Sequence, residues 1–163
     1  VLIGAIVEGP KVGAFVGLIF GLYSLWQNVT APNILSPLFY NPVVSVLPRI
    51  LFPVIAWALF KLNPMKTLAP RIIIAAFLGT IAHTAMVMGL AYIFYADLLA
   101  NALQTSTEMV GWATLGISAV HGLPEAILAG VFVTAIAMPL RLMLGKDKKK
   151  MHPNFVKDDE ANQ

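Results

Sequence analysis

Four ionisable side chains lie within stretches of sequence that are otherwise apolar: Arg49, His83, His121 and Glu125. At a rise of about 1.5 Å per helical residue, all four fall in the middle or outer half of a bilayer. Ionisable groups at that depth are costly, so each one is a candidate for binding or transport.

His121 and Glu125 are four residues apart and therefore share one helix face, and Gly122 and Pro124 between them loosen the backbone. The unpaired backbone groups of such a broken helix could bind a polar ligand. Two interpretations stay open. Arg49 and Glu125 could neutralise each other as a buried pair that holds two helices together, or they could line a ligand site. The two interpretations are compatible.

His83 stands between Thr80 and Thr84, so it could contact a ligand or only form a hydrogen bond across a helix bundle. Residues 27–42 (QNVTAPNILSPLFYNP) are polar, uncharged and rich in Pro and Asn. This segment could be a lid over a site or an ordinary interfacial loop with aromatic residues at its edges.

The composition sets these residues in a membrane. Of 163 residues, 58% are hydrophobic and 12% are charged, against about 25% charged in a soluble domain. Residues 12–48 and 72–96 contain no Asp, Glu, Lys or Arg, and the chain has no Cys for thiol chemistry. The positive charge comes largely from a C-terminal cluster, which indicates contact with anionic membrane lipids rather than with nucleic acid.

Apolar blocks at residues 1–7, 12–26, 43–60, 72–96 and about 112–144 predict an all-α, polytopic transmembrane bundle with four complete spans and a partial one. The first block is expected to be the end of a helix whose beginning is missing. Prolines at positions 48, 53, 124 and 139 predict kinks or breaks within two of the spans.

Basic residues recur in alternate loops: near Lys11, between Lys61 and Arg71, and from Arg141 onward. The loops at 27–42 and 97–111 have none, so the basic loops are expected to share one face, which the positive-inside rule assigns to the cytoplasm. We expect a membrane domain at residues 1–145 and a charged, disordered cytoplasmic tail at residues 146–163.

Small residues recur every four positions at Gly13, Gly17 and Gly21. This spacing places them on one helix face and predicts close packing against another backbone. Ala75, Gly79 and Ala82 predict the same for the span at 72–96.

No HExxH, P-loop or nucleophile-elbow motif occurs in the sequence. A metal site formed by His83, His121 and Glu125 is chemically possible, but the spacing matches no known pattern. Because no nucleotide-binding element is present, the energy for any transport must come from a gradient or from partner proteins.

Three runs resemble the substrate-binding S components of energy-coupling factor (ECF) vitamin transporters, particularly the pantothenate type: GPKVGAFVGLIFGLYSLWQ (9–27), SPLFYNPVVSVLPRILFPVIAWALFK (36–61) and HGLPEAILAG (121–130). The resemblance implies a six-helix membrane protein, of which this chain lacks the first helix and first loop. Such a protein captures a vitamin outside the cell. It docks on a transmembrane coupling protein (EcfT) with two cytoplasmic ATPases, so it needs no cofactor and is no enzyme, since the partners use the ATP.

Mapped onto this sequence, the pocket of that family would lie among the outer loop after Trp26 and the outer halves of the last three helices. The resemblance implies that Arg49 binds a substrate carboxylate, while His121 and Gln27 or Asn41 bond hydroxyl and amide groups. Pantothenate-type relatives commonly have Asn where this chain has His121, so a thiamine precursor or a cobalamin-related compound stays an alternative. A proton-coupled carrier using His83, His121 and Glu125 as a relay, or a metal-dependent membrane enzyme, would belong to other classes.

Overall fold

The computed structural model describes residues 1–33, 35–106 and 108–147. These residues form helices and no strands. The helices are α1 (Leu2–Glu8), α2 (Pro10–Thr30), α3 (Ser36–Phe39), α4 (Pro42–Ser45), α5 (Leu47–Leu62), α6 (Leu68–Ala102) and α7 (Val110–Met143). Four segments are long and apolar enough to cross a membrane: Pro10–Thr30, Pro42–Leu62, Leu68–Ala102 and Val110–Met143. The predicted all-α membrane bundle with four complete spans is confirmed.

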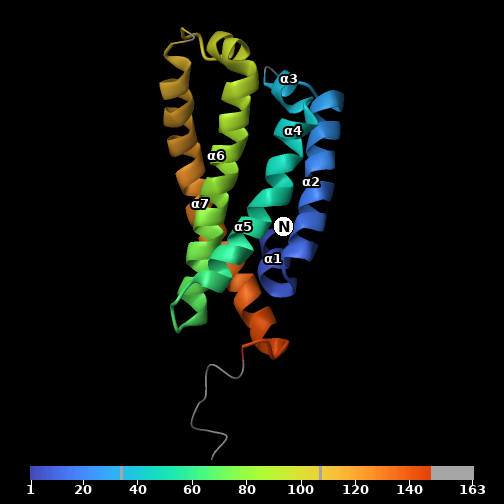
Figure 1. The fold of residues 1–163 in the computed structure, drawn as a ribbon, viewed down its shortest axis with the longest axis vertical. Helices are drawn as coiled ribbons and strands as arrows, with labels where there is room; N and C mark the ends of the chain where they lie inside the picture. The colour runs from blue at the N-terminus through green and yellow to red at the C-terminus, as the bar shows by residue number, and fades with distance from the viewer. Residues whose placement is uncertain (34, 107, 148–163) are drawn as a thin grey trace, which may run out of the picture.

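The long helices run beside one another, and their connections gather at two ends (Figure 1). The α1–α2 and α5–α6 turns lie at the same end as the C-terminal end of α7, and these segments carry the described basic residues other than Arg49. Helices α3 and α4 and the α6–α7 connection lie at the other end. We call these the basic end and the opposite end. The predicted grouping of the basic loops is confirmed, and their assignment to the cytoplasm stays a prediction.

The prolines act differently from one another. The span Pro42–Leu62 is interrupted at Val46, and Pro48 lies in the first turn of α5, where a missing N–H leaves no hydrogen bond unmade. Helix α7 runs from Val110 to Met143 with Pro124 inside it, so the helix is not broken there, and a kink at this proline stays a prediction. A residue with non-helical geometry does occur within α6, at Tyr95 (φ −142°, ψ 34°), although the turn before it contains no proline.

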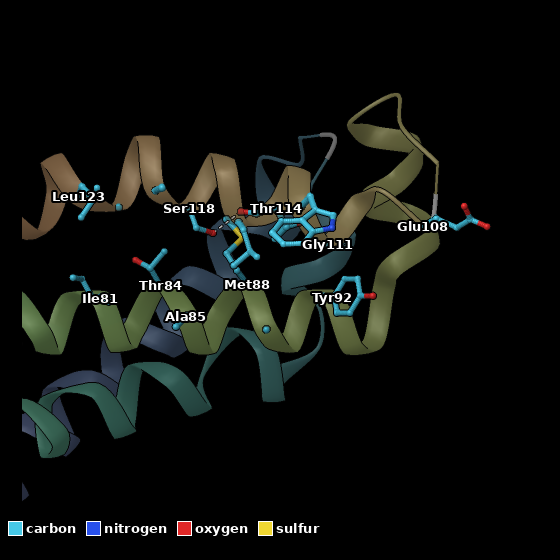
Figure 2. A pocket seen from close by; sticks show the side chains of 15 residues that line it. Ile81, Thr84, Ala85, Met88, Tyr92, Glu108, Gly111, Thr114, Ser118 and Leu123 are labelled. Carbon is cyan, nitrogen blue, oxygen red and sulfur yellow. Dashed lines mark hydrogen bonds between the residues drawn. The ribbon is translucent and has the colours of Figure 1, made fainter.

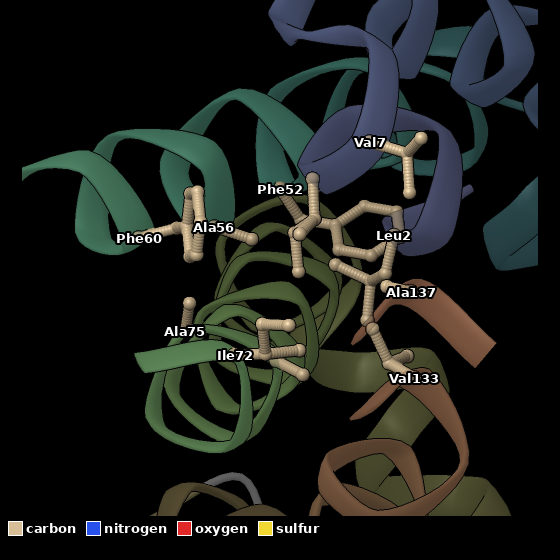
Figure 3. Packing of buried hydrophobic residues seen from close by; sticks show 11 residues of the cluster. Leu2, Val7, Phe52, Ala56, Phe60, Ile72, Ala75, Val133 and Ala137 are labelled. Carbon is tan, nitrogen blue, oxygen red and sulfur yellow. The ribbon is translucent and has the colours of Figure 1, made fainter. Parts of the chain in front are cut away.

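Two apolar clusters hold the helices together. The larger cluster lies toward the basic end and joins α1, α5, α6 and α7 (Figure 3); its buried members are Leu2, Ile6, Val7, Phe52, Ala56, Phe60, Ile72, Ala75, Ala76, Val133 and Ala137. The smaller cluster lies at the opposite end, where Leu38 of α3 packs against α6 and α7; its buried members are Leu38, Ala91, Leu99, Ala100 and Val110.

The glycine stripe of α2 packs as predicted. Gly13, Gly17 and Gly21 are the buried residues of this helix. A Cβ added at Gly13 would lie 2.5 Å from the Cβ of Ala5, and one at Gly17 would overlap the carbonyl oxygen of Arg49. One at Gly21 would lie 2.8 Å from the Cα of Val46. The stripe therefore lets α2 approach both α1 and the α4–α5 break.

At the basic end, Phe60 lies between two guanidinium groups. The ring centroid is 4.6 Å from the Cζ of Arg71 and 4.7 Å from that of Arg141. Arg141 also bonds through Nε to the carboxylate of Asp147 at 2.6 Å, and its Nη1 donates to the carbonyl of Ile6 at 2.6 Å. The buried arginine thus ties α7 to the C-terminal turn of α1.

The first two residues of the predicted tail belong to this packed end. Lys146 Nζ donates to the carbonyl of Val7 at 2.8 Å and lies 3.0 Å from a carboxylate oxygen of Glu8. Asp147 is buried with its arginine partner. The rest of the tail, 148–163, lies outside the described residues.

Replacing Gly17 by Ala should lower the free energy of unfolding by about 1–3 kcal/mol, because the new Cβ would meet the backbone of Arg49. Thermal unfolding in detergent would measure this. The matched control is Gly116→Ala, where an added Cβ meets no atom within 4 Å. Equal melting temperatures for the two variants would contradict the close approach of α2 to α5.

Replacing Arg141 by Gln should destabilise the protein by about 3–5 kcal/mol, because it leaves the buried Asp147 carboxylate without its partner. The control is Lys61→Gln, which changes an exposed cation at the same end. The same unfolding measurement applies, and equal stability of the two variants would argue against an Arg141–Asp147 pair.

Candidate binding site

A layer of polar groups separates the two apolar clusters. Along α6, residues of the larger cluster end at Ala76 and those of the smaller one begin at Ala91. His83 falls between them. Along α7 the corresponding interval runs from Val110 to Val133. The ionisable residues of α6 and α7 that the sequence singled out therefore lie at one level of the bundle.

Several buried polar atoms in this layer lack a hydrogen-bond partner. They are Ser45 Oγ, Arg49 Nε, His83 Nε2 and Thr114 Oγ1, on four different helices. A buried polar atom without a partner is costly, and in a native protein it indicates a place for water or a ligand. Another such atom, Arg71 Nε, belongs to the basic end.

Arg49 is 7% exposed and lies in the first turn of α5. Its Nη1 donates to the carbonyl of Val44 at 2.9 Å, and its Cζ lies 5.4 Å from the centroid of the Phe39 ring. Ion pairs join Arg141 to Asp147 and Lys146 to Glu8, and none is formed between Arg49 and Glu125. The structure therefore does not form the Arg49–Glu125 pair that one interpretation of the sequence proposed, and Glu125 is exposed.

His83 connects the surroundings of Arg49 with a cavity. Its ring lies 4.7 Å from that of Phe52, one turn along α5 from Arg49. His83 also lines a cavity of about 170 Å³ together with His121 and Glu125. Three of the predicted site residues thus come together. Within the described ranges, no three His, Asp or Glu side chains are placed to hold a metal ion.

A larger cavity of about 660 Å³ adjoins this one between α6 and α7 (Figure 2). The two share Thr84, Met88, Ser118 and Gly122. Toward the opposite end the larger cavity is bordered by Tyr92 and Glu108, and Trp112 also lines it. Apolar walls with a few polar groups, at a volume of about 300–1,000 Å³, are typical of small-molecule sites.

Helix α7 contributes a polar stripe that the sequence analysis found only in part. Thr114, Ser118, His121 and Glu125 are spaced by four, three and four residues and share one face. All four line one or both cavities, and the Ser118 hydroxyl donates to the carbonyl of Thr114 at 2.7 Å. The helical spacing of polar residues was the signal that could have identified the first two.

Two predicted site residues lie away from both cavities. The side chain of Asn41 accepts a hydrogen bond from the backbone N–H of Val43 at 2.9 Å and caps α4. Gln27 is exposed near the end of α2. A contact of either residue with a ligand stays a prediction.

The segment 27–42 contains ordered structure at the opposite end. The Ser36 hydroxyl donates to Asn28 Oδ1 and accepts from the N–H of Asn33, both at 2.8 Å. These bonds hold α3 so that Leu38 packs in the smaller cluster and Phe39 lies over Arg49. The segment covers Arg49 in this structure, and its opening as a lid stays a prediction.

Thr114→Val should leave the ligand-free protein as stable as before or stabilise it slightly, because it removes a buried hydroxyl that has no partner. Thr80→Val is the matched control, since the equally buried Thr80 hydroxyl donates to the carbonyl of Ala76 at 2.9 Å. Its loss should cost about 1 kcal/mol. Thermal unfolding without ligand measures the stability of both variants. If Thr114→Val were less stable than Thr80→Val, the Thr114 hydroxyl would have a hydrogen-bond partner, contrary to the structure.

Comparison with known proteins bears on what the layer binds. The family model described as "ECF transporter, substrate-specific component" matches residues 1–137. The chain is 31% identical over 157 residues to the pantothenic acid transporter PanT of Lactococcus lactis subsp. cremoris (strain MG1363), covering 86% of this chain and 74% of the relative. It is 33% identical over 142 residues to the pantothenate transporter PanT of Leuconostoc mesenteroides subsp. mesenteroides, covering 83% of this chain and 69% of the relative.

The family match agrees with the resemblance found in the sequence, and it identifies a transport protein rather than an enzyme. The four spans add that it is a multi-pass membrane protein. This chain belongs to the family of substrate-specific components of ECF transporters.

Proposed function

We propose that this chain is the subunit that binds pantothenate for an ECF transporter. The observation that carries the proposal is the layer of partnerless polar atoms between the two apolar clusters, together with the adjoining cavities along α6 and α7. Two relatives named as pantothenate transporters support the choice of vitamin.

The groups in the layer suit the chemistry of pantothenate, which has one carboxylate, two hydroxyls and one amide. Arg49 is a cation with a free donor at this level, and a carboxylate would balance its charge. His83 and His121, with the hydroxyl groups of Thr114 and Ser118, can donate to or accept from hydroxyl and amide groups. The apolar walls between α6 and α7 can contact the methyl groups.

The direction of transport follows from the charges at the two ends. Basic loops favour the cytoplasmic side of a membrane, so the basic end and the C-terminal tail face the cytoplasm in this proposal. The half of the bundle with Arg49 and the cavities then faces outward, where the vitamin is captured.

Release inward would depend on partners. The sequence has no phosphate-binding loop, so this chain hydrolyses no ATP and holds no cofactor in this proposal. A transmembrane coupling protein (EcfT) and two cytoplasmic ATPases would supply the energy.

Titration calorimetry of the full-length purified protein against pantothenate and its neutral alcohol pantothenol tests the function. We expect one-to-one binding of pantothenate and binding of pantothenol at least tenfold weaker, because the alcohol lacks the charge that pairs with Arg49. In Arg49→Gln the two ligands should bind alike. Lys61→Gln, a cation change at the basic end, should keep the discrimination.

A panel of other B vitamins in the same titration tests the choice of substrate. Tight binding of a different vitamin, with none of pantothenate, would contradict the proposed substrate while keeping the transporter family. Equal discrimination by the wild type and Arg49→Gln would show that Arg49 does not bind the carboxylate.

A further inference from the structure

A buried cation at the basic end, Arg71, has no anionic partner among the described residues. It lies in the first turn of α6 and is 6% exposed. Its Nη2 donates to the carbonyl of Phe60 at 2.9 Å, and its Cζ lies 4.6 Å from the centroid of the Phe60 ring. Its Nε is buried and has no hydrogen-bond partner. A guanidinium offers five N–H donors, so most of the donors of Arg71 are unused.

The acidic residues described at this end already have cationic partners. Asp147 accepts a hydrogen bond from Nε of Arg141 at 2.6 Å, and a carboxylate oxygen of Glu8 lies 3.0 Å from Nζ of Lys146. Arg141 also faces the ring that Arg71 faces, with its Cζ 4.7 Å from the ring centroid, so a second positive charge is close by. A buried cation without a counter-ion is costly. Arg71 therefore favours an anion from its surroundings.

One side of the Arg71 guanidinium is open to such an anion. Its Nη1 forms no hydrogen bond with a described residue and, unlike Nε, is not fully buried. Two exposed lysines belong to the same turn: Lys61 directly follows Phe60, and Lys66 lies in the segment that leads into α6. Positive charges gathered in one place raise the local concentration of anions. The α5–α6 turn thus combines an incompletely bonded guanidinium with two mobile cations.

The same turn has the apolar side chains that contact with a lipid requires. Leu62 is 81% exposed and Met65 is 43% exposed. Trp57 lies one helical turn before Lys61, whose Nζ is 5.8 Å from the centroid of the Trp57 ring. Trp and Lys at the end of a spanning helix are typical of the headgroup region of a membrane. A soluble anion would leave Leu62 and Met65 in water, whereas a phospholipid would contact both the charges and the apolar side chains.

We propose that the α5–α6 turn binds an anionic phospholipid: Arg71 donates hydrogen bonds to its phosphate, Lys61 and Lys66 flank the headgroup, and Leu62 and Met65 contact the lipid beside it. Arg71 lines neither of the cavities between α6 and α7, so this site is additional to the one proposed for the vitamin. A lipid bound here balances the charge of Arg71 and holds the end of α5 against the start of α6.

Native mass spectrometry of the full-length protein, titrated with phosphatidylglycerol and with phosphatidylcholine, tests the site. The wild type should bind phosphatidylglycerol more tightly, because the choline group of the other lipid cancels the phosphate charge. Arg71→Gln should bind phosphatidylglycerol about tenfold more weakly than the wild type, since hydrogen bonds from a charged group are lost. The control is Lys11→Gln, which removes an exposed charge from the α1–α2 turn at the same end and should bind as the wild type does. Equal losses in the two variants, or equal binding of the two lipids by the wild type, would overturn the site.

Two further measurements exclude misfolding and a soluble ligand. Lys66→Gln changes an exposed side chain, so the fold is kept, and it should weaken binding of phosphatidylglycerol about fivefold, the effect of one basic residue near an anionic membrane surface. Unchanged binding in this variant would contradict the site even if Arg71→Gln does not fold. In thermal unfolding of the wild type, phosphatidylglycerol should raise the melting temperature and inorganic phosphate at the same concentration should not. An equal rise with inorganic phosphate would show a site for soluble anions and overturn the lipid assignment.

Discussion

The burial of Arg49 at membrane depth is the constraint on which the rest of the structure depends. A guanidinium in this position is costly, yet it has one carbonyl and one aromatic ring as partners. Its place is set by backbone packing rather than by an ion pair, because Gly17 lets α2 press against the Arg49 carbonyl. The two apolar clusters lie on either side of this level. A charge that is fixed in position but incompletely satisfied is suited to binding an anion from outside.

The two ends of the bundle differ in how completely their polar groups are satisfied. At the basic end, Arg141, Asp147 and Lys146 tie α7 to the end of α1, and Phe60 packs between two guanidinium groups. Toward the opposite end, Val46 separates α4 from α5, and α6 departs from helical geometry at Tyr95. The hydroxyl groups of Ser45 and Thr114 lack hydrogen-bond partners there. Departures from local regularity thus gather in the half of the bundle away from the basic end, as expected if stability is supplied at the basic end.

Much of the fold could be predicted because a membrane imposes simple rules. The number of complete spans, the alternation of basic loops and the four-residue glycine repeat each depend on local sequence, and the structure confirms them. The site could be predicted less well. Pro48 and Pro124 look alike in sequence, but one begins a helix after a break and the other lies within a continuous helix. Which side chains meet depends on helix rotation, so neither the missing Arg49–Glu125 pair nor the partnerless Ser45 could be foreseen. The packing of Lys146 and Asp147 against α1 depends likewise on a contact that is distant in sequence.

An experimental structure of the full-length protein with pantothenate bound would test the central claim most directly, since it shows where the carboxylate lies. We expect ligand density between α5, α6 and α7, with the carboxylate at Arg49 and the hydroxyl and amide groups toward His83 and His121. A ligand bound elsewhere, with Arg49 paired to Glu125 or another protein carboxylate, would contradict it.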